Sequence, residues 1–245
     1  SLDGKIGVQK PTTSTDPNTG TGSSSSNSQT GQSTSQNEAS TGTTEVAVPS
    51  TLADGMIKVQ NKLDNSAGEI YANGGIDLTT NQGLMNDNGE LGLRNLVVTG
   101  DQVSNQSGKI FTQSANFDVN TVNNQKGVIS SAGILNINSQ TNIDNTAGQL
   151  TSGDTLILSS KGDLNNSFGT IGSDKTVSLR NQNINNTQGN INSSTNINIQ
   201  AQQVDNTQGK IVSEQGTTLQ STALTNTEGQ VQASSLDIKT EPYRV

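Results

Sequence analysis

The side chains that most often carry chemistry are scarce in this sequence. Histidine and cysteine are absent, which removes the commonest general base, the commonest metal ligand and every disulfide bond. Enzymes that cleave polysaccharides can instead use clustered carboxylates, with calcium or an arginine base. Here Arg94, Arg180 and Arg244 are the only arginines, and acids such as Asp64 and Asp144 stand singly. We therefore expect no catalytic site, no bound metal and no cofactor.

Aromatic platforms for a glycan are also few. Aromatic residues make up 2% of the chain and tryptophan is absent, whereas glycan sites commonly stack sugars on aromatic rings. Phe117 and Phe168 are expected to fill the core or to cover a turn. A protein receptor that docks on a flat strand face or a loop stays open as an alternative.

The charge pattern does not indicate a polyanion as partner. The chain has 13 basic and 21 acidic residues, a net charge of -8 and no run of either sign, so we expect no nucleic-acid binding. No apolar stretch approaches the roughly 18 residues that a membrane helix needs, and no signal segment opens the chain. We therefore expect no membrane insertion of this segment.

One polar pair, Asn-x-x-Gly, recurs nine times at intervals of 19 to 21 residues. The asparagines are Asn65, Asn86, Asn105, Asn124, Asn145, Asn166, Asn186, Asn206 and Asn226. The glycines are Gly68, Gly89, Gly108, Gly127, Gly148, Gly169, Gly189, Gly209 and Gly229. Asparagine and glycine are preferred at the first and fourth positions of a type I turn, so each pair predicts such a turn.

Apolar residues flank every one of these pairs at fixed distances. One lies two places before each asparagine, as Ile143 does, and another lies two places after each glycine, as Leu150 does. A short alternating pair such as Leu156 and Leu158 follows in the middle of most repeats. Because side chains at i and i+2 share one face of a strand, each repeat is predicted to form two or three short strands and no helix.

A unit of about 20 residues cannot enclose a core alone and must stack on its neighbours. The predicted fold is therefore an all-β parallel β-helix, or solenoid, of nine repeats over residues 51–240, about 43 Å long at roughly 4.8 Å per coil. Equivalent turns would lie above one another, so the nine asparagine amides are predicted to form a structural ladder.

The two ends of the chain do not follow the regular repeat. Residues 9–50 consist mainly of Ser, Thr, Asn, Gln and Gly, and such a segment is expected to be a disordered flexible linker because it cannot bury enough apolar surface. Residues 1–8 resemble the end of a preceding repeat, and residues 241–245 are assigned to a tail.

The repeat apolar-x-Asn-x-x-Gly-x-apolar resembles the filamentous haemagglutinin repeats of large bacterial exoproteins, over residues 61–240. These include haemagglutinin-type adhesins and contact-dependent growth inhibition effectors, which leave the cell by two-partner secretion. The resemblance implies a right-handed parallel β-helix in a secreted filament on the bacterial cell surface. It also implies an outer-membrane two-partner secretion transporter as partner during export.

Three functions follow as alternatives. The first is a structural shaft segment, expected to be monomeric, that projects an adhesive or toxic domain toward a target cell. The second is an adhesin or receptor-binding module, for which the partner is a target-cell receptor. The third is a polysaccharide-active enzyme, because the fold also resembles that of pectate-lyase-like β-helices. Scattered acids and arginines disfavour this third function.

Overall fold

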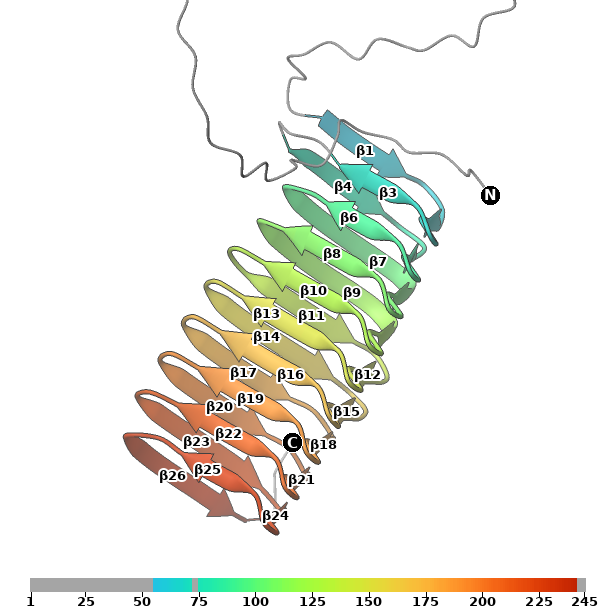
Figure 1. The fold of residues 1–245 in the computed structure, drawn as a ribbon. Coiled ribbons are helices and arrows are strands. Elements are labelled where there is room, and N and C mark those ends of the chain that lie inside the picture. Colours follow the sequence, from blue (N-terminus) through green and yellow to red (C-terminus); the bar gives the residue numbers. More distant parts are fainter. Residues whose placement is uncertain (1–54, 72–74, 242–245) are drawn as a thin grey trace, which may run out of the picture.

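The computed structural model describes residues 55–71 and 75–241, which form a rod of stacked coils (Figure 1). Neighbouring strands in the rod are parallel and come from consecutive coils, as a β-solenoid requires. The predictions for residues 1–8 and 9–50 lie outside the described residues, as do residues 51–54 and 72–74 of the predicted solenoid and all of the predicted tail at 241–245 except its first residue. Within the described ranges there is no helix, and hence none that could cross a membrane.

Each coil has up to three strands, and the first two belong to a 17-stranded sheet. The first strands are β1 (Gly55–Val59), β4 (Ile76–Thr80), β7 (Asn95–Ser104), β9 (Ser114–Asn123), β11 (Leu135–Ser139), β14 (Thr155–Ser160), β17 (Thr176–Arg180), β20 (Asn196–Gln200), β23 (Gly216–Ser221) and β26 (Ser235–Thr240). The second strands are β2 (Leu63–Asp64), β5 (Leu84–Met85), β12 (Ile143–Asp144), β15 (Leu164–Asn165), β18 (Asn183–Asn185), β21 (Gln203–Asp205) and β24 (Ala223–Thr225).

The third strands form a 9-stranded sheet that faces the first (Figure 1). They are β3 (Glu69–Tyr71), β6 (Glu90–Gly92), β8 (Lys109–Thr112), β10 (Val128–Ser131), β13 (Gln149–Ser152), β16 (Thr170–Ser173), β19 (Asn190–Ser193), β22 (Lys210–Ser213) and β25 (Gln230–Gln232). The Asn-x-x-Gly turn joins the second strand to the third, and a second corner joins the third strand to the next coil.

The core consists of columns in which one aliphatic position repeats in coil after coil. Leu150, for example, pairs in register with Ile129 on one side and Ile171 on the other, and all three are fully buried. The apolar positions predicted from the repeat therefore face inward. Because every coil contributes to the same columns, a coil buries its side chains against its two neighbours rather than within itself.

Differences in repeat length are absorbed at the bends. In the two 19-residue repeats, β7 and β9 each run ten residues through a bend that elsewhere separates the first strand from the second. The aliphatic columns stay in register across both strands, with Leu96 beside Ala115 and Val103 beside Val122. Shortening a connection thus changes neither the core nor the turn, as expected when insertions and deletions fall in loops.

The last described coil differs from the others. Leu236 and Ile238 occupy aliphatic core columns, yet 47% and 37% of their surfaces are exposed. The equivalent residues of the preceding coil, Thr217 and Leu219, are buried. Their positions follow the sequence pattern, but among the described residues no further coil covers them.

Candidate functional site: polar ladders along the corners

The structure brings the nine repeated asparagines together in one column at the corner between the second and third strands. The side-chain amides of the first eight, Asn65 to Asn206, each donate from Nδ2 to Oδ1 of the asparagine in the next coil, over 2.6 to 2.7 Å. We call this column of residues the asparagine ladder. Its members from Asn86 to Asn206 are fully buried, Asn65 is nearly so, and Asn226 is exposed.

Each buried amide in the ladder makes further hydrogen bonds to the backbone. Nδ2 of Asn145 also donates to the carbonyl of Gly148 at 3.3 Å and to the carbonyl of Thr170 in the next coil at 3.1 Å. Its Oδ1 accepts from Asn124 at 2.7 Å. A carboxylate could only accept, so aspartate could not replace this group without placing charge against three acceptors.

The turn that holds each asparagine is not the type I turn that the sequence predicts. The backbone bond from Gly148 to the Asn145 carbonyl is present at 3.0 Å, but Ala147 at the third position has a φ of 54°. A type I turn needs a negative φ there, and a positive value is typical of type II. All nine turns share this feature, although none has glycine at the third position.

A bond to the next coil explains the positive φ. The N–H of Ala147 donates to the Ser167 carbonyl at 2.9 Å, and that of Lys126 donates to the Thr146 carbonyl at 3.0 Å. The left-handed conformation points this N–H along the rod axis, where it donates to the carbonyl of the next coil. The stacking therefore outweighs a local preference of roughly 1 to 2 kcal/mol against that conformation.

Phe168 offers a test of this strain. It occupies the third turn position with a φ of 58° and is 62% exposed, so little of its surface is buried. Asparagine tolerates the left-handed region and stands at the equivalent position as Asn88. We expect Phe168→Asn to raise the free energy of unfolding by about 1 kcal/mol, measured by equilibrium denaturation. A lower stability would mean that the ring makes stabilising contacts on the turn.

The glycine of each pair is required because a larger side chain would not fit, and not because its φ is positive. A Cβ built on Gly148 would lie 2.1 Å from the backbone oxygen of Asn124 and 2.7 Å from Oδ1 of Asn145. The corresponding Cβ would approach the preceding coil as closely at Gly127 and Gly209. Glycine lets successive turns stack tightly enough for the amides to meet.

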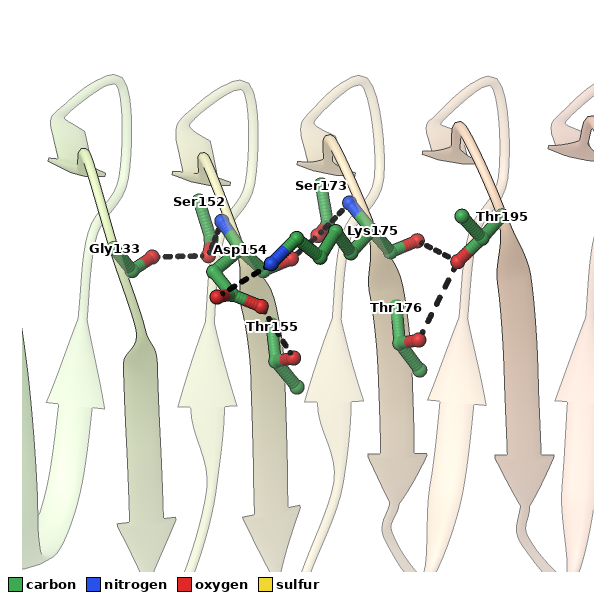
Figure 2. A network of polar contacts seen from close by, with 8 residues as sticks. All are labelled: Gly133, Ser152, Asp154, Thr155, Ser173, Lys175, Thr176 and Thr195. Carbon is green, nitrogen blue, oxygen red and sulfur yellow. Dashed lines mark hydrogen bonds and ion pairs between the residues drawn. The ribbon is translucent and has the colours of Figure 1, made fainter.

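A second column of polar side chains, which we call the serine ladder, lines the corner between the third strand and the next coil (Figure 2). Ser152 donates to the Gly133 carbonyl of the preceding coil at 2.6 Å, and Ser173 donates in the same way to the carbonyl of Asp154. The Ser152 hydroxyl also accepts the N–H of Asp154 at 3.2 Å. The ladder consists of Ser131, Ser152, Ser173 and Ser193.

The serine ladder was not predicted from the sequence, although the sequence contains a signal for it. Each of its residues lies four places after the glycine of a pair, as Ser152 does after Gly148. The chain is so rich in serine that a fixed spacing of serine alone is inconspicuous. The serine position becomes recognisable as part of the repeat only when it is counted from the glycine of each pair.

A third recurring position was also missed, directly before the asparagine ladder. Oδ1 of Asp144 accepts the N–H and the hydroxyl of Thr146, at 2.9 and 2.6 Å. Asp205 holds Thr207 in the same way, and Asn165 and Asn185 do so in two other coils. These side chains form Asx turns that fix the start of each corner.

The charged groups considered for chemistry are engaged in structural contacts or lie apart. Arg94 forms a bidentate pair with Asp77, at 2.9 Å from Nε and 2.8 Å from the terminal nitrogen, and Asn95 donates to the same carboxylate at 2.8 Å. Arg180 lies on a first strand several coils away. In residues 55–71 and 75–241 no three acidic side chains gather as metal ligands would.

The Asp77 pair gives a pH prediction. The hydrogen bond from Arg94, and then that from Asn95, lowers the pKa of Asp77 below its usual value. A lowered folded-state pKa contributes stability above the unfolded value of about 3.9, and this contribution is lost as the pH falls through the folded pKa. We expect Asp77→Asn to lower the stability at pH 7 and to flatten its decline between about pH 4 and 2, measured by urea denaturation. An unchanged pH profile would contradict this role.

The described part of the rod has several shallow depressions, among them one of about 480 Å³ beside Ser160 and Arg180. Another is a groove of about 320 Å³ over β13, β16, β19 and β22, and its lining includes Gly172, Asp174, Asn192 and Glu214. No aromatic ring lines it. Phe117 is fully buried in the core, as the sequence indicates, whereas Phe168 stands exposed on its turn.

The fold and the two ladders together define a protein built of sequence repeats that form a parallel β-solenoid. The family model described as haemagglutinin repeat matches residues 100–147, 114–168 and 169–240, which together cover more than half of the chain. The chain therefore belongs to the haemagglutinin repeat family. Comparison with curated proteins and with solved structures gave no match.

Proposed function

We propose that this chain is a shaft segment of a secreted filamentous exoprotein on the bacterial cell surface. The observation that carries the proposal is that the recurring polar side chains are used by the fold itself. Asn145, for example, accepts from Asn124 and donates to Asn166 in the two neighbouring coils, and Ser152 donates to the Gly133 carbonyl of the preceding coil. Such a rod can supply length and stiffness, and could hold an adhesive or toxic domain away from the cell.

The family supports the location and the export route in this proposal. Haemagglutinin repeats are typical of exoproteins that leave the cell by two-partner secretion, so the first partner would be the outer-membrane transporter of that system. Threading an unfolded chain outward and folding it coil by coil suits a fold in which each coil contacts only its neighbours. No catalytic role belongs to the proposal.

A length variant tests the shaft. Deleting residues 128–169 joins Gly127 to Thr170 and removes two whole coils, so the core columns and both ladders continue across the junction. The rod should shorten by about 10 Å in small-angle scattering and stay folded.

The purified chain should neither bind target cells saturably nor cleave polysaccharides. Saturable cell binding or cleavage would contradict a purely structural role.

One observation favours the alternative, an adhesin segment that binds a receptor directly. The groove over β13 to β22 is the kind of concave polar surface that could accept a protein loop, with Asp174 and Glu214 on its lining. If the chain binds target cells, Asp174→Lys with Glu214→Lys should abolish the binding, and Asp118→Lys on the opposite sheet should not. Binding that survives the groove variants would place the receptor site elsewhere.

A further inference from the structure

A pocket of about 480 Å³ lies where the first strands β14 and β17 end and the chain bends toward the second strands. In the outward column of paired positions, Ser159 lies between Asn138 and Arg180, and its small side chain leaves room for the pocket. The larger side chains of the lining are Asn138, Lys161, Arg180, Asn181, Gln182 and Gln202. Among the described residues, no acidic and no aromatic side chain lines this pocket.

The two basic side chains of the pocket are both exposed and unpaired. Neither the guanidinium of Arg180 nor the ammonium of Lys161 forms an ion pair or a side-chain hydrogen bond with a described residue. Asp163, the acid nearest to Lys161 along the chain, instead accepts the side-chain amide of Asn183 at 2.8 Å. In a chain with a net charge of -8, two free cations at one pocket favour an anionic ligand.

The lining also has amide groups without partners. Asn181 is only 6% exposed, and its Nδ2 donates to Ser160 Oγ at 2.7 Å, but its Oδ1 accepts no hydrogen bond from the described residues. A buried acceptor is normally paired, so a donor group from a ligand would be stabilised there. The exposed carboxamides of Gln182 and Gln202 are likewise unpaired among the described residues, and each can both donate and accept.

We propose that this pocket binds an acidic peptide segment of a partner protein. One carboxylate of the peptide accepts two parallel hydrogen bonds from the guanidinium of Arg180, and a second carboxylate pairs with the ammonium of Lys161. The carboxamides of Gln182 and Gln202 bond to the backbone of the peptide. A backbone N–H of the peptide donates to Oδ1 of Asn181.

The lining favours a peptide over a carboxylated saccharide, which carries the same charge. Sugar rings commonly stack on aromatic side chains, and among the described residues none lines the pocket. Side-chain amides, by contrast, match both the N–H and the C=O groups of a peptide backbone.

The inference goes beyond the shaft proposal and does not rest on it, because the pocket residues belong to neither the asparagine ladder nor the serine ladder. The pocket also differs from the groove over β13, β16, β19 and β22. That groove is lined by Asp174 and Glu214, which would repel an acidic peptide.

Removing both cations tests the site. The parent chain should bind a hexaglutamate peptide with a neutral fluorescent label saturably, one peptide per chain, in fluorescence polarisation. Lys161→Gln with Arg180→Gln should weaken this binding by at least about tenfold, because both charge-assisted contacts are lost. The double variant should fold, since Gln200 and Gln220 occupy the position of Arg180 in the next two coils.

Lys126→Gln with Lys210→Gln is the matched control. It removes the same charge from two exposed lysines, one on an asparagine turn and the other on β22. Glutamine is tolerated at both positions, because Gln208 and Gln230 are their equivalents in other coils. The control should bind hexaglutamate as the parent chain does. Equal weakening in the two double variants, or no saturable binding by the parent chain, would overturn the proposal.

Competition identifies the class of ligand. Unlabelled hexaglutamate should displace the labelled peptide, and hexaglutamine of the same length should need at least about tenfold more to do so. An oligogalacturonate of similar charge should also compete only at higher concentration than hexaglutamate. Displacement by the oligogalacturonate at a lower concentration would assign the pocket to a carboxylated saccharide and overturn the peptide as its ligand.

Discussion

Gly148→Ala is expected to prevent stable stacking of the coil that carries it and to lower the free energy of unfolding by about 3 to 5 kcal/mol. The added methyl group would lie 2.1 Å from the backbone oxygen of Asn124 and 2.7 Å from Oδ1 of Asn145. The first of these is main chain in the preceding coil, so no side-chain rotation relieves the clash. Relief requires the two turns to move apart, which lengthens the ladder bond between Asn124 and Asn145.

Gly216→Ala is the matched control for this substitution. Gly216 also lies inside the solenoid, on β23, but the nearest atom to its added Cβ is Oδ1 of Asn196 at 2.9 Å, the end of a flexible side chain. The control should change the stability by less than about 1 kcal/mol. Both variants are compared by guanidinium denaturation followed by circular dichroism. Equal stabilities would show that the turns are not packed as closely as the structure indicates.

The fold could be predicted from the sequence because a solenoid turns sequence spacing directly into spatial neighbours. Once the period of about 20 residues is known, the residues above and below Ile171 are those one repeat away, Leu150 and Ile191. The same argument predicts that the asparagine amides meet. In an ordinary globular domain, spacing along the chain carries no such information about contacts between distant elements.

The details that the sequence failed to predict are those set by the neighbouring coil. Preferences for single turns favour glycine or asparagine at a positive φ, yet Phe168 and Lys126 adopt it because their N–H groups bond to the next coil. The serine ladder depends similarly on a carbonyl supplied by the coil before it. Rules for isolated turns contain no term for these bonds, so they give the wrong turn type and overlook the second ladder.

Asn145→Asp is expected to lower the free energy of unfolding by about 3 kcal/mol at neutral pH. The amide of Asn145 donates to Asn166 Oδ1, to the Gly148 carbonyl and to the Thr170 carbonyl, and the residue is fully buried. A carboxylate would face these three acceptors without a proton to offer. Burial and the missing donors would raise its folded-state pKa above the unfolded value of about 3.9.

The pH dependence separates this charge effect from a simple loss of packing. An acid with a raised folded pKa destabilises little while it is protonated in both states, and the penalty grows as the pH rises above about 4. The stability gap between Asn145→Asp and the parent chain should therefore widen from pH 4 to pH 7 in urea denaturation. Asn136→Asp serves as control. The side-chain amide of Asn136 donates a hydrogen bond of equal length to Asn116, but it lies on the outer wall, where the introduced carboxylate would remain hydrated. A gap that is constant with pH, or as large in the control, would show that the ladder does not depend on the buried amide.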